Sequence, residues 1–383
     1  MIITSKKIFL FAVLFFALIA KSELAKSQYV LLEAEQEFKL LHYNKAIKLY
    51  TEAYQKKATL KAIERLATCY RLTKDYQQAE SWYALLAQTK GAKPDAFLYY
   101  GDALRNNSKF SEAKIQYEKY GNLDKNISLA QKNTLLLSCD SALSWMNKPK
   151  AVSINNEVNL NTEYEDWGAV KYQNAIVFTS DRKTKIDIEP VKDDKPFLKF
   201  DNANQLPDKV IYGWTGNNYL KLYKKTNEPI SLFPFEAGSD YHVGAASFTA
   251  DGNEMYFTLT KIPSVIEREK GIPKTIKVEI YSSKKDANGN WGTPLSFKYN
   301  NVNLYSVGDP FISKNGNELY FVSDMPGGKG KTDIYVCTKT TEGNWGPAIN
   351  LEELNSEGAE RTPFIDNENN FYFANKMQQR RRG

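Results

Sequence analysis

The hydrophobic positions of this chain follow two different periods in its two parts. Between Gln28 and about Asn122, apolar and small residues recur at the spacing of helices that pack in pairs. Farther along, hydrophobic and polar residues alternate, as in NELYFVS at Asn317–Ser323 and EMYFT at Glu254–Thr258. Strict alternation is typical of a strand with one buried face. The pattern therefore predicts a multidomain α + β protein, in which an all-helical part is followed by an all-β part.

The helical part contains a repeat of 33 or 34 residues. Its small residues form two sets, Ala34, Ala67 and Gly101, and, twelve residues later, Ala46, Ala79 and Ala113. Four residues farther on comes an aromatic set, Tyr50, Tyr83 and Tyr117. Small residues allow the helices of a pair to approach closely, and the tyrosine fills the gap to the next pair. The repeat resembles the tetratricopeptide repeat, whose period is about 34 residues, and predicts an α-solenoid over residues 28–147.

A further helix is predicted from Ser128 to Met146, with Ser128 as its N-cap. Its apolar stripe consists of Leu129, Leu135, Leu136, Leu143 and Trp145. Such a helix would cover the end of the solenoid, because a terminal repeat needs a different outer face. Asn147-Lys148-Pro149 ends the helix and marks the domain boundary, since the residue before a proline disfavours helical backbone.

The β part is built on a repeated hairpin. Its clearest copy is GDPFISKNGNELYFVSD at Gly308–Asp324, and related copies span Gly168–Arg182, Gly244–Thr260 and Glu360–Lys376. Asp-Gly and Asn-Gly turns within these copies favour tight hairpins, because both residues adopt positive φ. A repeated hairpin unit predicts a β-propeller. Trp291 and Trp345, 54 residues apart in NWGTPLSF and NWGPAINL, mark about one blade with its connections, and we expect both rings to pack between blades.

These motifs resemble the WD-like β-propeller repeat of Bacteroidetes-type OmpA-family proteins. The matching positions are Gly308, Asp309, Pro310, Tyr320, Phe321, Asp333 and Trp345, with Trp291 in the preceding copy. Tetratricopeptide repeats followed by this propeller are also the order of the family. The resemblance implies a protein similar to a periplasmic component associated with type IX secretion, in which an OmpA-type peptidoglycan-binding domain follows the propeller.

The number of blades departs from that family. We count about four blade-like units, near Val158–Ile230, Ser231–Phe297, Lys298–Leu351 and from Glu352 onward, and the last lacks its third strand. A propeller must close to bury its strand edges. We therefore expect an incomplete propeller over residues 151–383, in a chain truncated at its C-terminus, and binding to peptidoglycan only if a further domain exists.

The first 27 residues have the pattern of a signal peptide. Lys6 and Lys7 precede an apolar run of 13 residues, Ile8–Ala20, which is shorter than the about 20 residues that span a bilayer. Cleavage is expected before Gln28, and an uncleaved N-terminal anchor is the alternative. The sequence thus predicts an exported protein of the periplasm or of the periplasmic face of the outer membrane.

Charge and cysteine content narrow the class of protein. Of the net charge of +6, the signal segment accounts for +3 and Arg380–Arg382 for the remainder, so the folded body is near neutral. A nucleic-acid partner is therefore not expected. Cys69, Cys139 and Cys337 are too far apart for a zinc or thioredoxin motif. Buried free thiols are expected, and a Cys69–Cys139 disulfide is left open.

No motif in the chain points to a reaction. The two histidines, His42 and His242, lie in different domains, and Gly330-Lys331-Thr332 lacks the first glycine and the helix of a phosphate-binding loop. The triad Asp286, Asn288 and Asn290 fits a hairpin turn better than a calcium loop. We therefore expect no catalytic, cofactor-binding or metal-binding residues.

A non-enzymatic interaction scaffold is the function that the repeats favour. Solenoids of this kind present a surface to protein partners. The alternative role for the helical part is that of a spacer that braces the propeller. Two alternatives stay open: a carbohydrate-binding propeller that uses Trp214, Trp291 and Trp345, and an enzyme with its site at the mouth of the propeller.

Overall fold

The computed structural model describes residues 28–149, 151, 153–183, 207–263, 267–269 and 272–376. The expected signal segment and the arginine-rich tail lie outside these residues. The chain forms two compact units, a helical one that includes Gly213–Gly216 and a β one that begins at Ile154. The first is an α-solenoid of tetratricopeptide type and the second is β-propeller-like, as the sequence predicted.

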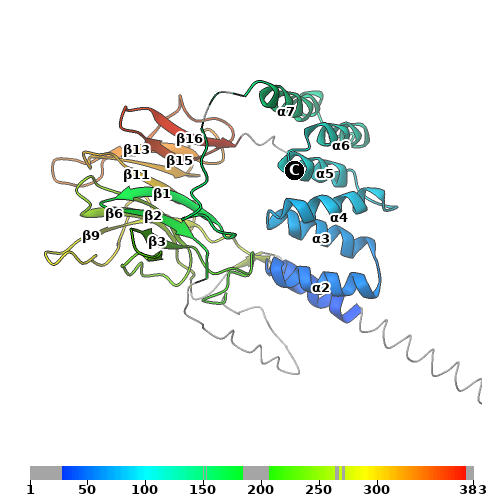
Figure 1. Cartoon of the computed structure of the whole chain (residues 1–383), viewed down its shortest axis with the longest axis horizontal. Helices are drawn as coiled ribbons and strands as arrows, with labels where there is room; N and C mark the ends of the chain where they lie inside the picture. Colours follow the sequence, from blue (N-terminus) through cyan, green and yellow to red (C-terminus); the bar gives the residue numbers. More distant parts are fainter. Residues whose placement is uncertain are drawn as a thin grey trace, which may run out of the picture. The chain divides into compact units, whose positions relative to one another are not determined.

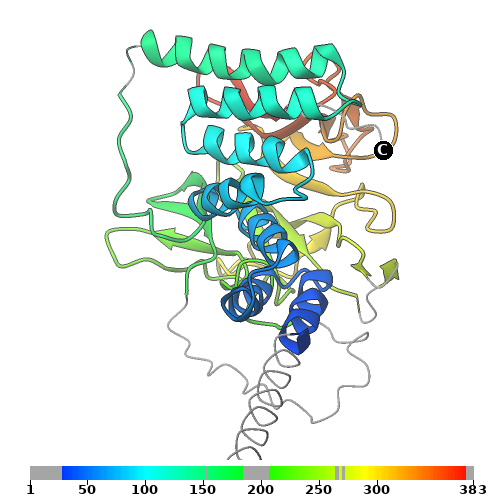
Figure 2. The ribbon, with the colours of Figure 1, turned by 90° about the vertical axis from the view of Figure 1, so that its right-hand side faces the viewer.

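The helical unit is a stack of antiparallel helix pairs (Figures 1 and 2). Residues 28–39 are helical, and the helices that follow are α2 (Tyr43–Lys56), α3 (Leu60–Leu72), α4 (Tyr76–Gln88), α5 (Asp95–Asn106), α6 (Phe110–Leu123) and α7 (Leu129–Asn147). Side chains of Thr59 and Asp75 cap α3 and α4 by accepting from backbone N–H groups of the first turn. Helices of only 12 to 14 residues depend on packing for their stability.

The repeat residues make up the core of this stack. The small residues Ala34, Ala46, Ala67, Ala79 and Ala113 are fully buried, as are the aromatic residues Tyr50, Tyr83 and Tyr117. Gly101 shows why the small positions matter: a Cβ placed there would lie 2.6 Å from the Tyr117 ring. The close approach of α5 and α6 therefore depends on the absence of a side chain at Gly101.

Helix α7 starts as predicted but presents a different face. Ser128 and Gln131 form a reciprocal capping box at its first turn. Cys139, Leu135 and Leu136 pack in the cluster around Tyr117. Two members of the expected stripe were placed wrongly, because Leu129 and Trp145 are 74% and 72% exposed. They lie at opposite ends of a 19-residue helix, and only its middle reaches the apolar cluster.

The β unit contains three four-stranded antiparallel sheets and a hairpin, each sheet a blade. The first has the order β1 (Asp166–Tyr172), β2 (Ala175–Ser180), β3 (Lys221–Lys225), β4 (Ser231–Leu232). The second has β10 (Leu295–Ser296), β9 (Val278–Lys284), β6 (Glu254–Thr260), β5 (Val243–Phe248), and the third has β11 (Val307–Ile312), β12 (Glu318–Ser323), β13 (Asp333–Thr338), β14 (Ile349–Asn350). The hairpin is β15 (Ala359–Ile365) with β16 (Phe371–Lys376), and β7 (Arg268–Glu269) pairs with β8 (Ile272–Pro273) in a small separate ribbon.

A bulge in the first strand of successive blades connects each blade to the one before it. Ala245, Asp309 and Thr362 occupy equivalent positions with φ of 46°, 49° and 51°. The N–H of Ala245 donates to Thr179 Oγ1, and that of Asp309 to Thr258 Oγ1, both at 3.0 Å. Because the bulged residue leaves the ladder of its own sheet, its N–H is available to the neighbouring blade.

Apolar side chains fill the space between consecutive blades. One cluster joins the first two sheets and includes Val177, Met255 and Phe257, all fully buried. A second joins the next two and includes Ile280, Leu319 and Phe321. Trp291 and Trp345 are half-buried and pack against the first and the second cluster, respectively.

Two further properties bear on the expectations above. Cys69, Cys139 and Cys337 are buried free thiols, so the Cys69–Cys139 disulfide does not form in this structure. Among the described residues, no helix combines the length and the apolar character needed to cross a bilayer.

Candidate functional site

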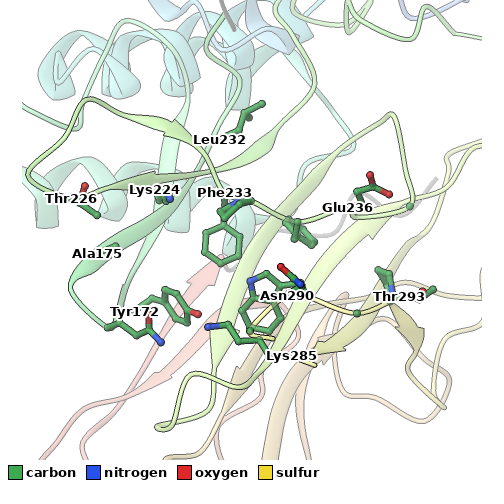
Figure 3. Close-up of a pocket in the computed structure, with 18 of the residues that line it drawn as sticks. Tyr172, Ala175, Lys224, Thr226, Leu232, Phe233, Glu236, Lys285, Asn290 and Thr293 are labelled. Atoms are coloured by element: carbon green, nitrogen blue, oxygen red, sulfur yellow. The ribbon is translucent and has the colours of Figure 1, made fainter. Parts of the chain in front are cut away.

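The candidate site in the β unit is a pocket of about 840 Å³ between the first two blades (Figure 3). Its walls come from the β1–β2 turn, from strands β3 and β4 with the loop after β4, and from the loop after β9. This last loop, Lys285–Pro294, carries the first of the two NWG motifs. Loops of successive blades thus shape the pocket, while the sheets beneath hold them in place.

Aromatic rings form the inner wall of the pocket. Trp291 lies with its ring centroid 5.9 Å from that of Phe233 and 6.2 Å from that of Tyr172. Phe248 of β5 completes the group at 6.1 Å from Trp291. Separations of this size are those of favourable aromatic pairs. The rings hold Trp291 in one orientation, and part of its surface stays accessible to the pocket.

Polar side chains surround these rings. Lys285 places its ammonium group 5.3 Å from the ring centroids of both Tyr172 and Trp291, within cation–π range. Asn290 and Glu236 line the pocket from the two neighbouring loops, and Lys224 lines it from β3 (Figure 3). The pocket therefore combines apolar ring faces with positively charged, negatively charged and amide side chains.

The next repeat has the same arrangement around Trp345, but there additional hydrogen bonds hold the loop that carries the tryptophan. Trp345 packs against Phe297 at 6.4 Å, as Trp291 does against Phe233. There Lys298 donates to the carbonyl oxygen of Trp345 at 2.6 Å, and the Tyr299 hydroxyl donates to that of Gly346 at 2.8 Å. Sequence reasoning treated the two tryptophans alike and missed this difference.

The helical unit presents a second candidate surface, a row of side chains on alternate helices that we call the Arg65–Arg71 row. Arg65 donates to the Glu35 carboxylate at 2.9 Å, and its guanidinium stands 4.2 Å from the ring centroid of Phe38. Arg71 of the same helix, α3, stands 4.0 Å from the ring of Tyr99 on α5. The row thus links residues 28–39, α3 and α5 by charge-assisted and cation–π contacts.

The hydroxyl group of each of the three repeat tyrosines binds a side chain of the preceding helix. Tyr50 donates to Glu35 at 2.5 Å, Tyr117 donates to Asp102 at 2.8 Å, and Tyr83 accepts from Arg71 at 3.1 Å. Burial would raise the pKa of Glu35, but the hydrogen bonds from Arg65 and Tyr50 outweigh it and lower that pKa. The tyrosines therefore orient charged side chains in addition to filling gaps, a role that spacing alone did not reveal.

The two histidines contribute to neither surface. His42 contacts Glu37 at 2.9 Å in the helical unit. His242 sits against Tyr212 and Tyr219 in the β unit, and its Nδ1 accepts from the N–H of Leu220 at 3.2 Å. Burial lowers the pKa of His242 to about 4. In the described part of the chain, no group of three or more His, Cys, Asp or Glu is placed to hold a metal ion.

The remaining sequence-predicted residues lie in structural positions. Asp309, whose side chain is almost fully buried, accepts from Arg361, and Asp333 accepts from the N–H groups of Lys329 and Gly330 in the turn before β13. Pro310 belongs to β11, and Tyr320 and Phe321 belong to β12. Gly308 packs against Thr258 and Val278 of the neighbouring blade.

The candidates for a calcium loop and for a carbohydrate-binding ring also have structural contacts. Asp286 accepts from the N–H groups of Asn288 and Asn290, and these bonds form a turn. Trp214 is half-buried within the helical unit and donates to the carbonyl of Leu72 at 3.0 Å.

Comparisons with known proteins do not show a family for this chain. No family model and no curated protein matches the chain. The Sgt2 TPR domain from Aspergillus fumigatus is 21% identical over 34% of this chain and 89% of its own, with a TM-score of 0.28. The first TPR of Spaghetti (RPAP3) bound to an HSP90 peptide is 24% identical over 31% of this chain and 94% of its own, with a TM-score of 0.28. The Pseudomonas aeruginosa periplasmic gluconolactonase PpgL is 9% identical over 41% of this chain and 43% of its own, with a TM-score of 0.26.

Proposed function

We propose that the protein is a non-enzymatic scaffold that binds protein partners through its helical repeats. The Arg65–Arg71 row carries this proposal. Its arginine and tyrosine side chains are of the types enriched where protein interfaces gain most of their affinity. Ion pairs and ring contacts already hold them in place, so little side-chain entropy is lost when a partner binds.

The accessibility of these side chains supports a role beyond internal packing. The side chains of Arg65 and Glu35 are 27% and 21% exposed, and Tyr99 is only half-buried. By contrast, Tyr50, which donates to Glu35 from α2, is fully buried. The partner that this row fits presents carboxylate and apolar groups, which match the guanidinium groups and the rings.

A photo-crosslinking experiment in cells tests this proposal. A photoreactive phenylalanine replaces Tyr99 on α5, and a matched control replaces Ile115, which is 50% exposed on α6. We expect an adduct of defined mass from position 99 and none from position 115, and we expect R65E/R71E to remove it. Equal adducts from both positions, or an adduct that survives the double charge reversal, would contradict the proposal.

The same proposal includes a place for the protein in the cell. We infer export to the periplasm or to the periplasmic face of the outer membrane, in an envelope complex of the type IX secretion kind. The support is the signal-like segment and the resemblance of the repeats to OmpA-family proteins of the Bacteroidetes type. Cell fractionation with N-terminal sequencing tests it: the mature chain should begin at Gln28, and a cytoplasmic, uncleaved chain would refute the export.

A further inference from the structure

The pocket between the first two blades can be compared directly with its copy one repeat later. Phe233 donates its N–H to the carbonyl of Leu222 at 2.9 Å, and Phe297 donates to that of Ile280 at 3.0 Å. Each phenylalanine then packs against the tryptophan of the following blade, Trp291 or Trp345. The register of the two copies is therefore fixed, and Pro234 corresponds to Lys298.

The next residue in each copy confirms this register. Phe235 packs against Phe257 of β6 with ring centroids 5.1 Å apart, and Tyr299 packs against Phe321 of β12 at 6.0 Å. The two rings therefore fill equivalent places, and Phe235 differs from Tyr299 in lacking the hydroxyl group. In the first copy the hydroxyl of Ser283 takes this role, because it donates to the carbonyl of Gly292 at 2.7 Å.

One donor of the second copy thus has no substitute in the first. Lys298 donates to the carbonyl oxygen of Trp345 at 2.6 Å and stands 5.0 Å from the Tyr299 ring centroid. Proline has neither an ammonium group nor a backbone N–H to offer in its place. Lys298 fills the space beside Trp345 in the second copy. The equivalent space beside Trp291 in the first copy is part of the pocket, which Pro234 lines.

We propose that this pocket binds a primary ammonium group, that of a lysine side chain presented by a partner protein, in the place that Lys298 fills one repeat later. The backbone carbonyl of Trp291 accepts from it, the Phe235 ring provides a cation–π face, and Glu236 adds a carboxylate. The stem of the lysine lies along the exposed part of Trp291. This site belongs to the β unit and does not rest on the role proposed for the helical repeats.

The positive charge of Lys285 is compatible with such a ligand. The second copy has a lysine in the same position, Lys339, whose ammonium group is 5.1 Å from the Trp345 ring centroid. Lys298 occupies its place there in the presence of Lys339. Two ammonium groups thus share one tryptophan in the second copy, where the Glu254 carboxylate lies 3.2 Å from the ammonium group of Lys339. In the pocket beside Trp291, the carboxylate that lines the site is that of Glu236.

The test uses the full chain and follows the indole N–H signal of Trp291 by NMR, assigned with Trp291→Phe. Nα-acetyl-lysine methylamide is the probe, and the norleucine analogue, which has a similar stem and no charge, is its control. We expect saturable shifts with the lysine probe, with a dissociation constant on the order of millimolar for so small a ligand, and no saturable shift with norleucine.

Two variants distinguish this pocket from nonspecific binding. Pro234→Lys should fill the site internally, abolish the shifts and raise the melting temperature of the β unit by about 2–4 °C. Pro347→Lys also exchanges a proline for a lysine, in the loop that carries Trp345 and outside the pocket, and this variant should bind the probe as the unmodified chain does. Equal binding of norleucine, binding of methyl glucoside in place of lysine, or undiminished lysine binding by Pro234→Lys would overturn the proposal.

Discussion

Arg361 of β15 donates two hydrogen bonds to the carboxylate of Asp309 on β11, at 2.5 and 3.0 Å. The Asp309 side chain is only 4% exposed, and the N–H of Thr362 is its third donor. The terminal hairpin is thereby attached to the blade before it through one charged group. A buried carboxylate is stable only when its partners are present.

Replacement of Arg361 by alanine should therefore destabilise the β unit by about 2 kcal/mol, because it leaves a buried charge with a single backbone donor. Urea unfolding gives the free-energy difference. Asp309→Asn/Arg361→Ala should recover part of the loss, since the charge is removed with its partner. If R361A unfolds at the urea concentration of the unmodified chain, the hairpin does not depend on this pair.

Gly101 gives a prediction for the helical unit. A Cβ at this position would lie 2.6 Å from the Tyr117 ring, which is fully buried and cannot move aside. Gly101→Ala should cost about 1–3 kcal/mol by overpacking, in spite of the better helix propensity of alanine. Thermal unfolding followed by circular dichroism measures the change.

Gly121→Ala is the matched control on α6. Its Cβ would meet only the flexible side chain of Lys132, which is able to swing away. Helix propensity should then dominate, and the substitution should be neutral or stabilising by up to about 1 kcal/mol. A similar loss of stability in both variants would mean that close packing against Tyr117 is not the reason for glycine at position 101.

These sites show how far the sequence alone could go. The helix pairs and the blades were predictable, because Ala34, Ala67 and Gly101 recur at one spacing and the hairpins at another. The pocket was not, because it results from a difference between copies: Pro234 stands where the next copy has Lys298. A repeat pattern predicts the features that all copies share, but it does not predict a site that depends on a difference between two copies.

Contacts between distant segments were beyond sequence reasoning for a different reason. The Asp309–Arg361 pair joins residues 52 apart, and Tyr50 reaches Glu35 across a helix pair. The prediction of a buried stripe on α7 was partly wrong for a related reason. Periodicity shows which face of a helix is apolar, but it does not show how much of the helix's length a neighbouring element covers. Leu129 and Trp145 lie beyond that length.

The cysteines should be unreactive in the folded protein. All three are buried free thiols, and burial raises the pKa of Cys69 and of Cys337 to about 12. Because the thiolate is the reactive species, iodoacetamide at pH 8 should modify none of them within an hour, and all three after denaturation. Mass spectrometry counts the modified thiols, and rapid alkylation of the native chain at Cys337 would contradict its burial between blades.

His242 makes the stability of the β unit depend on pH. Burial lowers its pKa in the folded chain to about 4, from an ordinary value of about 6.5. Between these values the unfolded chain binds a proton that the folded chain does not, so stability falls as the pH falls from 6.5 toward 4. The slope contributed by this one group is at most about 1.4 kcal/mol per pH unit.

Calorimetric unfolding of the β unit between pH 7 and pH 5 measures this slope, in a range where ordinary carboxylates scarcely titrate. His242→Asn should unfold more easily at pH 7, since it loses ring contacts with Tyr212 and Tyr219, but its stability should change less with pH. His42→Asn, at the exposed histidine of the helical unit, should leave the slope for the β unit unchanged. An unaltered slope in His242→Asn would show that other groups cause the acid sensitivity.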